Sequence, residues 1–134
     1  MKRQLLGLAL SALLCNGAHA EQWVEVGSRA DGVAQYLDLD SIERNLGLVE
    51  LDRMIDYPVQ QQTAGGKGFA SQRIRTEFEC GNRAMRQVRV QWLAGRKGAG
   101  ALVDESSVPD DWAIDQFDAF TGPLWQIACE SAGN

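Results

Sequence analysis

The side chains that usually carry enzymatic chemistry are scarce in this chain of 134 residues. Its one histidine, His19, lies in an N-terminal segment that we expect to be removed on export. Without histidine, Ser-His-Asp and Cys-His arrangements and most zinc sites are excluded. Carboxylates are plentiful, but none stands in a context that singles it out as a tuned acid, which leaves a two-carboxylate hydrolase as an unsupported alternative. We therefore predict a non-enzymatic protein with no catalytic residues, no cofactor and no metal.

The first twenty residues have the three parts of a secretory signal peptide. Lys2 and Arg3 supply a positive start, Leu5–Leu14 is apolar and uncharged, and Ala18-His19-Ala20 offers small residues to signal peptidase. The apolar run is shorter than the roughly 20 residues that a membrane-spanning helix needs. We expect a signal peptide at residues 1–20, one exported domain at 21–134 and no membrane span.

Cys15 offers another route of processing. A lipoprotein signal places a small residue directly before the cysteine that is lipidated, and here that residue is Leu14. We therefore expect a periplasmic or secreted protein, with the outer-membrane surface as the alternative if Cys15 is lipidated.

Cleavage after Ala20 leaves two cysteines, Cys80 and Cys129. An even pair in a small exported domain predicts a disulfide, because the compartment is oxidising. A redox-active pair usually has the spacing Cys-x-x-Cys, whereas these two lie far apart in the chain. We expect the bridge to be structural and to stabilise the fold by about 2–4 kcal/mol.

The charge of the exported chain is acidic and unevenly placed. Removing Lys2 and Arg3 from 13 basic residues leaves 11 against 18 acidic ones, a formal net charge of −7. No basic residue follows Lys97, so the excess lies in the C-terminal third. This argues against nucleic acid and anionic membranes as partners. The acidic segment could instead cover an arginine-bearing face of this chain or of a neighbour.

Alternating apolar residues and turn signals predict a single α+β domain. We expect strands at Trp23–Gly27, Ala34–Leu39, Leu48–Tyr57, Phe69–Cys80, Ala84–Ala94 and Gly100–Val103. Pro58 is expected to stop the third strand, because proline cannot donate to a ladder. A closing helix is predicted at Pro123–Ala132, with Thr121 as its cap and one face packed on the sheet.

The fourth and fifth strands form the strongest hairpin signal. Apolar residues share one face only if Ile74 lies opposite Val90 and Thr76 opposite Val88, which predicts a three-residue connection or a bulge. In that register Arg75 faces Arg89 on the outer side, with Arg73 beside them. Such a face is either simply solvated or a stripe that binds an anion or a partner.

Several short segments, in their order along the chain, are similar to one known family. They are Trp23, Tyr36-Leu37-Asp38, Ser41-Ile42, the strand ending at Tyr57, Glu77-Phe78-Glu79-Cys80, the arginine-containing strand to Trp92, Trp112 and Cys129. Together they resemble the surface-adhesin protein E family of Gram-negative bacteria, over essentially the whole exported chain. The order of the segments and the placement of the cysteines carry the resemblance.

The resemblance implies an antiparallel sheet of about six strands with a helix on one face, a disulfide between Cys80 and Cys129, and a possible homodimer. The named member of the family is a surface lipoprotein that binds host matrix and plasma proteins. The chain is therefore expected to be a non-catalytic binding module with a protein partner, and Arg73, Arg75 and Arg89 are its candidate binding residues. A periplasmic housekeeping or envelope-stress protein without a host ligand is the alternative.

The processing site can be tested directly. Mass measurement of the exported chain is expected to give a species that begins at Glu21 and carries no lipid. A diacylglycerol adduct on Cys15 would instead place the protein on a membrane surface and contradict cleavage after Ala20.

Overall fold

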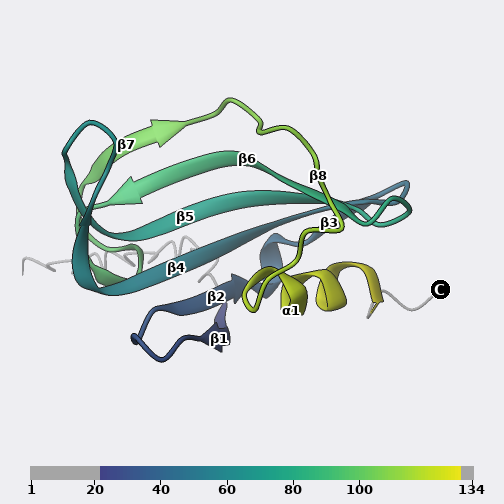
Figure 1. Cartoon of the computed structure of the whole chain (residues 1–134), viewed down its shortest axis with the longest axis horizontal. Coiled ribbons are helices and arrows are strands. Elements are labelled where there is room, and N and C mark those ends of the chain that lie inside the picture. Colours follow the sequence, from purple (N-terminus) through teal and green to yellow (C-terminus); the bar gives the residue numbers. More distant parts are fainter. Residues whose placement is uncertain (1–21, 131–134) are drawn as a thin grey trace, which may run out of the picture.

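One antiparallel sheet organises the chain, with a short helical segment packed on one of its faces (Figure 1). The structure is a computed structural model that describes residues 22–130. The predicted signal peptide, its cleavage site and Cys15 lie outside the described residues. None of the described helices is long and apolar enough to cross a membrane.

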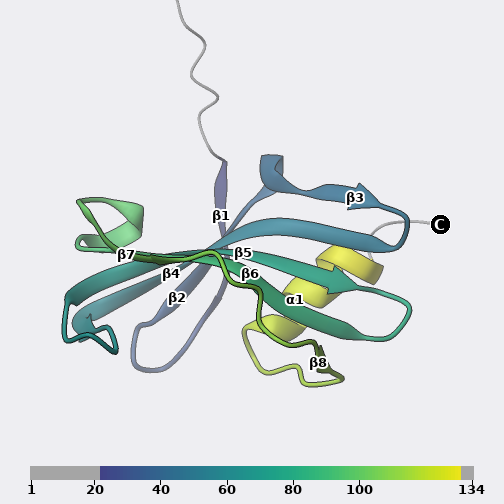
Figure 2. The same cartoon turned by 90° about the horizontal axis from the view of Figure 1, so that it is seen from above.

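The elements follow one another in a simple order. They are β1 (Trp23–Ser28), β2 (Ala34–Asp38), the 3-10 turn η1 (Leu39–Ser41), β3 (Glu43–Asn45), β4 (Leu48–Gln62), β5 (Gly68–Glu79), β6 (Ala84–Leu93), the turn η2 (Arg96–Gly98), β7 (Leu102–Ser106), β8 (Ala113–Ile114), the helix α1 (Thr121–Trp125) and the π-helical turn η3 (Gln126–Glu130). The main path across the sheet is β1-β2-β4-β5-β6-β7. Figure 2 shows β3 and the connection between β6 and β7 at opposite ends of the sheet.

The expected six strands correspond to this main path, but the described sheet has eight strands. The two additional strands are short: β3 pairs with the start of β4, and β8 pairs with the start of β6. Leu46 and Gly47 both have positive φ angles, 49° and 83°, which allow the tight two-residue turn between β3 and β4. β3 contains only polar residues and β8 only two residues, so neither gives an alternating apolar pattern in the sequence.

The expectation that Pro58 ends the third strand was wrong. β4 continues through Pro58 to Gln62. The regular pairing of β4 with β5 is interrupted between Asp56 and Gln61, around the residue that has no N–H to donate. Proline therefore interrupts the ladder here without ending the strand.

The register of the β5–β6 hairpin agrees with the expectation near its centre, where Ile74 pairs with Val90 and Arg75 with Arg89. The expected pair between Thr76 and Val88 is wrong, because the register shifts after Arg75 and Thr76 pairs with Gln87. The bulge that the alternation required is thus present. It lets both strands keep their apolar side chains on one face despite the shift.

The face that carries the helix holds the apolar core. One cluster gathers residues of β2, β4, β5 and β6 beneath α1 and η3: Leu37, Val49, Leu51, Phe78, Met85, Leu124, Trp125 and Ala128. A second cluster lies further along the same face: Val33, Ile55, Ile74, Val90 and Phe120. Most of the charged side chains of the central strands therefore lie on the opposite face of the sheet.

The closing helix differs from its expected form. It begins at Thr121, two residues early, and changes from α to π geometry after Trp125. Thr121 is not its cap. The Asp118 carboxylate accepts hydrogen bonds from the amides of Phe120 and Thr121, both at 2.8 Å, and holds the start of the helix.

The disulfide between Cys80 and Cys129 is confirmed, with 5.5 Å between the two Cα atoms. It joins the residue after β5 to η3. The helical segment is short, since α1 and η3 contain five residues each, and so short a helix is marginal without tertiary support. The bridge and the Leu124 and Trp125 side chains together hold it on the sheet.

Replacing both cysteines by alanine is expected to lower the free energy of unfolding by about 2–4 kcal/mol, because the unfolded chain regains loop entropy. Urea denaturation of the oxidised, unaltered domain and of the doubly substituted domain measures the difference. Equal stability of the two proteins would show that the bridge does not secure the helix.

Candidate functional site

The three arginines expected to form a stripe meet on the face of the sheet opposite α1, which we call the open face. Arg75 pairs with Arg89 across the β5–β6 ladder, and Arg73 lies two positions along the same face of β5. With Trp23 of β1 and Gln91 of β6 they line a depression of about 620 Å³. β-sheet alternation explains this placement, because the intervening Ile74 points into the core.

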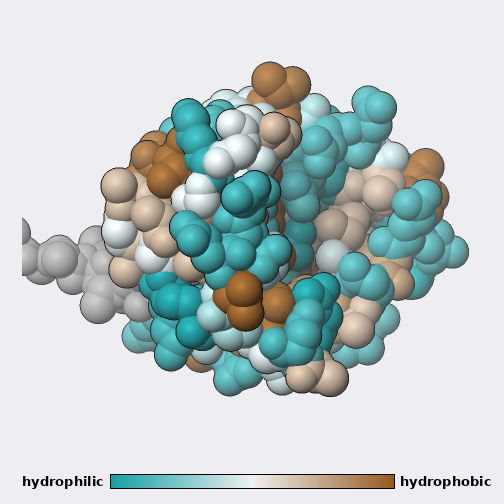
Figure 3. Space-filling view, turned by 60° about the vertical axis from the view of Figure 1, so that its left-hand side comes forward, coloured by the Kyte–Doolittle hydropathy of each residue, from teal (hydrophilic) through white to brown (hydrophobic). Residues whose placement is uncertain are grey.

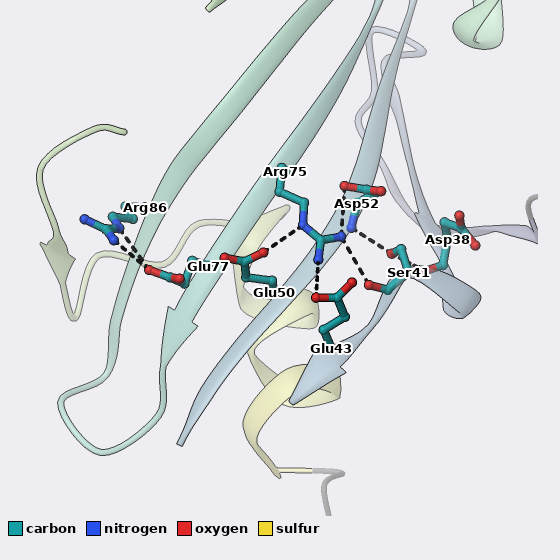
Figure 4. Close-up of polar contacts among 8 residues, drawn as sticks. All are labelled: Asp38, Ser41, Glu43, Glu50, Asp52, Arg75, Glu77 and Arg86. Carbon is teal, nitrogen blue, oxygen red and sulfur yellow. Dashed lines mark hydrogen bonds and ion pairs between the residues drawn. The ribbon is translucent and has the colours of Figure 1, made fainter. Parts of the chain in front are cut away.

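Arg75 lies at the centre of a network of polar contacts on this face (Figure 4). Its Nε donates to Glu50 Oε2 at 3.0 Å, and its Nη1 lies 3.2 Å from Asp52 Oδ1. Its Nη2 lies 3.4 Å from Glu43 Oε2, and Nη1 also donates to the Ser41 carbonyl at 3.2 Å. The guanidinium is thus surrounded by acceptors from η1, β3 and β4.

The neighbouring turn is fixed to the same strand. Ser41 Oγ accepts a hydrogen bond from the Asp52 amide at 2.8 Å and donates to the Asp38 carbonyl at 2.6 Å. These bonds fix the Ser41 carbonyl where Arg75 reaches it. Burial alone would lower the pKa of Arg75, but its hydrogen bonds and proximity to Glu50 and Asp52 outweigh burial and raise it. Arg75 therefore stays charged and acts as a scaffold for the face.

Arg75 and Arg89 pair with carboxylates of different strands, which relieves the repulsion expected between them. Arg89 Nε donates to Glu105 Oε1 of β7 at 2.7 Å. The acidic C-terminal third therefore does cover Arg89, as the charge distribution suggested, whereas the carboxylates around Arg75 come from β3 and β4. Arg73 lies over the Trp23 ring, 5.6 Å from its centroid.

Charge pairing continues along the open face. Arg86 Nη2 lies 2.9 Å from Glu77 Oε1, and its guanidinium covers the Trp112 ring at 4.3 Å. Asp56, whose side chain is 2% exposed, lies 2.7 Å from Arg96 Nη2. Hydrogen bonding from Arg96 is the main cause that lowers the pKa of Asp56. Several ion pairs therefore lie next to one another on this face.

The depression itself has no net formal charge, since Glu43, Glu50 and Asp52 balance its three arginines. A simple anion-binding stripe therefore does not describe it. Arg89 differs from Arg75 in exposure, 52% against 18% for the side chains. Arg89 has one carboxylate neighbour among the described ion pairs, so a partner can exchange with it at low cost.

Sequence reasoning missed Trp23, Gln91 and the carboxylates of β3 and β4 as parts of this site. Glu50 and Asp52 could have been found, because they alternate with the apolar Val49 and Leu51 and must share a face. Their meeting with Arg75 depends on the register of β4 against β5, which places Asp52 directly opposite Arg75. Trp23 reaches the depression from the other end of the chain, and no local pattern predicts that.

The described residues offer no alternative centre based on a metal. Within residues 22–130, no group of three or more His, Cys, Asp or Glu side chains could hold a metal ion. The open face offers hydrogen bonds, ion pairs and the Trp23 ring as means of recognition.

Comparison with known proteins agrees with the sequence resemblance. The family model described as surface-adhesin protein E matches residues 23–130. No curated protein matches the chain. A structure of Haemophilus influenzae protein E is similar with a TM-score of 0.61 and 19% identity, over 83% of this chain and 86% of that one. Its second crystal form gives a TM-score of 0.61 and 18% identity, over 86% and 99% of the two chains.

Arg75→Ala is expected to lower the free energy of unfolding by about 1–2 kcal/mol, because three carboxylates would then face one another without their shared cation. Arg89→Ala is the matched control, with an expected loss within about 0.5 kcal/mol for a half-exposed surface pair. Urea denaturation at low salt measures both. Equal effects of the two substitutions would mean that Arg75 does not organise the face.

Proposed function

This chain belongs to the surface-adhesin protein E family, and we propose that it is an exported, non-catalytic binding module that holds a protein partner on the open face of its sheet. The observation that carries the proposal is the depression lined by Arg73, Arg75 and Arg89 on the face of the sheet opposite α1. Family membership supports the proposed class of function, and the depression supports the proposed location.

The three arginines have different roles in this proposal. Arg75 holds the carboxylates of β3 and β4 in place. Arg89, half exposed, is available to a carboxylate of the partner, since surface ion pairs exchange readily. Arg73 lies over the Trp23 ring and both line the depression; arginine and tryptophan are among the residue types that most often anchor protein interfaces.

The character of the surface also favours polar recognition. On the side that Figure 3 shows, hydrophilic residues dominate and apolar residues form small, separate patches. The exposed large apolar residues are scattered over several elements and include Leu46, Val59, Val108 and Ile114. Three carboxylates and three arginines line the depression, so its partner is expected to carry mixed charges, and binding is expected to weaken with salt.

Binding of the purified domain, residues 21–134, to immobilised extracellular-matrix and plasma proteins tests the proposal. The Arg73→Ala/Arg89→Ala variant is expected to lose at least about tenfold in affinity, the effect of one well-placed charged contact. Arg75 is left intact in this variant so that the carboxylate network persists.

A control variant, Arg29→Ala/Lys67→Ala, removes the same charge from exposed residues that do not line the depression. Its affinity is expected to equal that of the unaltered domain. Unchanged binding of the Arg73→Ala/Arg89→Ala variant would reject the open face as the binding surface. A protein found only in the periplasm and protected from external protease would reject adhesion itself.

A further inference from the structure

A buried arginine lies on the opposite, covered face of the sheet. Arg53 of β4 shares its face with Leu51 and Ile55 and is 4% exposed. Its neighbours across the ladders are Leu37 of β2 and Ile74 of β5. The position therefore lies in the apolar core, where a charged side chain needs a reason to be present.

Arg53 is bonded only to neutral oxygens. Its Nε donates to Thr76 Oγ1 at 3.1 Å and its Nη1 to Gln35 Oε1 at 3.0 Å. Gln35 is itself fixed, because its Nε2 donates to the Phe120 carbonyl at 2.8 Å. None of the ion pairs found among residues 22–130 includes Arg53.

The carboxylate that acts on Arg53 through space is Asp118. Its Oδ1 is already occupied by the Phe120 and Thr121 amides and by Thr121 Oγ1 at the start of the helix. Burial lowers the pKa of Arg53 to about 10, so the guanidinium remains charged at neutral pH. A buried cation without a contacting anion is unfavourable, which makes it a natural place for an anionic group to bind.

Arg53 lines a pocket of about 360 Å³ that lies between β4, β6 and the segment leading to α1. The buried residues that line this pocket differ in chemistry from the exposed ones. Ile55, Met85 and Phe120 are buried with Arg53, whereas Asp110, Asp111 and Asp118 are exposed. Arg53 and apolar side chains thus lie inside. Three carboxylates lie toward the outside, together with the partly exposed Arg86, which is paired with Glu77.

This arrangement discriminates between ligands by charge. A simple anion would be drawn to Arg53 but repelled by three carboxylates on its way in. A simple cation would be held at the outside with nothing to offer Arg53. A neutral zwitterion can pair with both charges of the pocket, with its carboxylate toward Arg53 and its ammonium toward Asp118. An apolar side chain would fill the remaining space.

We propose that this pocket binds a free α-amino acid with an apolar side chain. Arg53 receives the carboxylate, the outer aspartates receive the ammonium, and Ile55, Met85 and Phe120 contact the side chain. The site lies on the other face of the sheet from the arginine depression, so it stands or falls independently of the proposed function.

Three probes of matched shape test the proposal on the unaltered domain: L-leucine, 4-methylpentanoate, which lacks the ammonium, and 3-methylbutylamine, which lacks the carboxylate. Leucine is expected to raise the melting temperature saturably and to bind at least about tenfold more tightly than either analogue in calorimetry, because each analogue loses one charged contact. The absence of a saturable effect of leucine at millimolar concentration would overturn the proposal. Equal binding of 4-methylpentanoate would also overturn it.

Substitutions separate a ligand site from a merely structural arginine. Arg53→Met removes a buried charge but leaves the Gln35 and Thr76 oxygens without their donor. These effects oppose each other, so stability is expected to change little, while leucine binding is expected to be abolished. Arg89→Met, on the open face, is the control and is expected to bind leucine normally. Asp111→Asn, at an exposed position, is expected to weaken leucine binding without changing stability. Normal leucine binding by both Arg53→Met and Asp111→Asn would contradict the site.

Discussion

Side-chain alternation along β5 governs the rest of the structure. Ile74 and Phe78 point toward the helical segment and the apolar core, so Arg73 and Arg75 must point to the other side. A slip of one residue would exchange the two sets and bury the arginines. The bulge opposite Thr76 in β6 prevents this, because it absorbs the extra residue and keeps both apolar sets together. The open charged face is therefore a direct consequence of the register.

Arg75 and Arg53 lie on opposite faces of the sheet and differ in the partners of their guanidinium groups. Arg75 meets three carboxylates and a carbonyl, and its pairs neutralise the open face while holding β3, β4 and β5 together. Arg53 meets two neutral oxygens inside the core and has no contacting carboxylate among the described residues. Paired charge on the surface suits exchange with a protein partner, whereas unpaired charge in a pocket suits a small ligand.

The sequence revealed the main strands, the disulfide, the bulge and the Arg75–Arg89 pairing, because each leaves a local pattern: apolar alternation, an even cysteine pair, or a conflict of register. It did not reveal β3, whose three residues are all polar, or the continuation of β4 through Pro58. Nor could it reveal what surrounds each arginine. Arg53 does stand in phase with Leu51 and Ile55 in the sequence, but only the packing of Gln35 and Phe120 around it shows that its charge has no contacting partner.

The central claim is that the open face, with Arg73, Arg75 and Arg89, is where a partner binds. The most direct test is a steric block within the depression, introduced by alkylating a Gln91→Cys variant with a bulky maleimide. The control carries the same label on Ser107→Cys, an exposed position that does not line the depression. Binding to a matrix or plasma protein is measured before and after labelling. The account predicts that the label on residue 91 abolishes binding and that the label on residue 107 leaves it unchanged. Undiminished binding with residue 91 labelled would contradict the account.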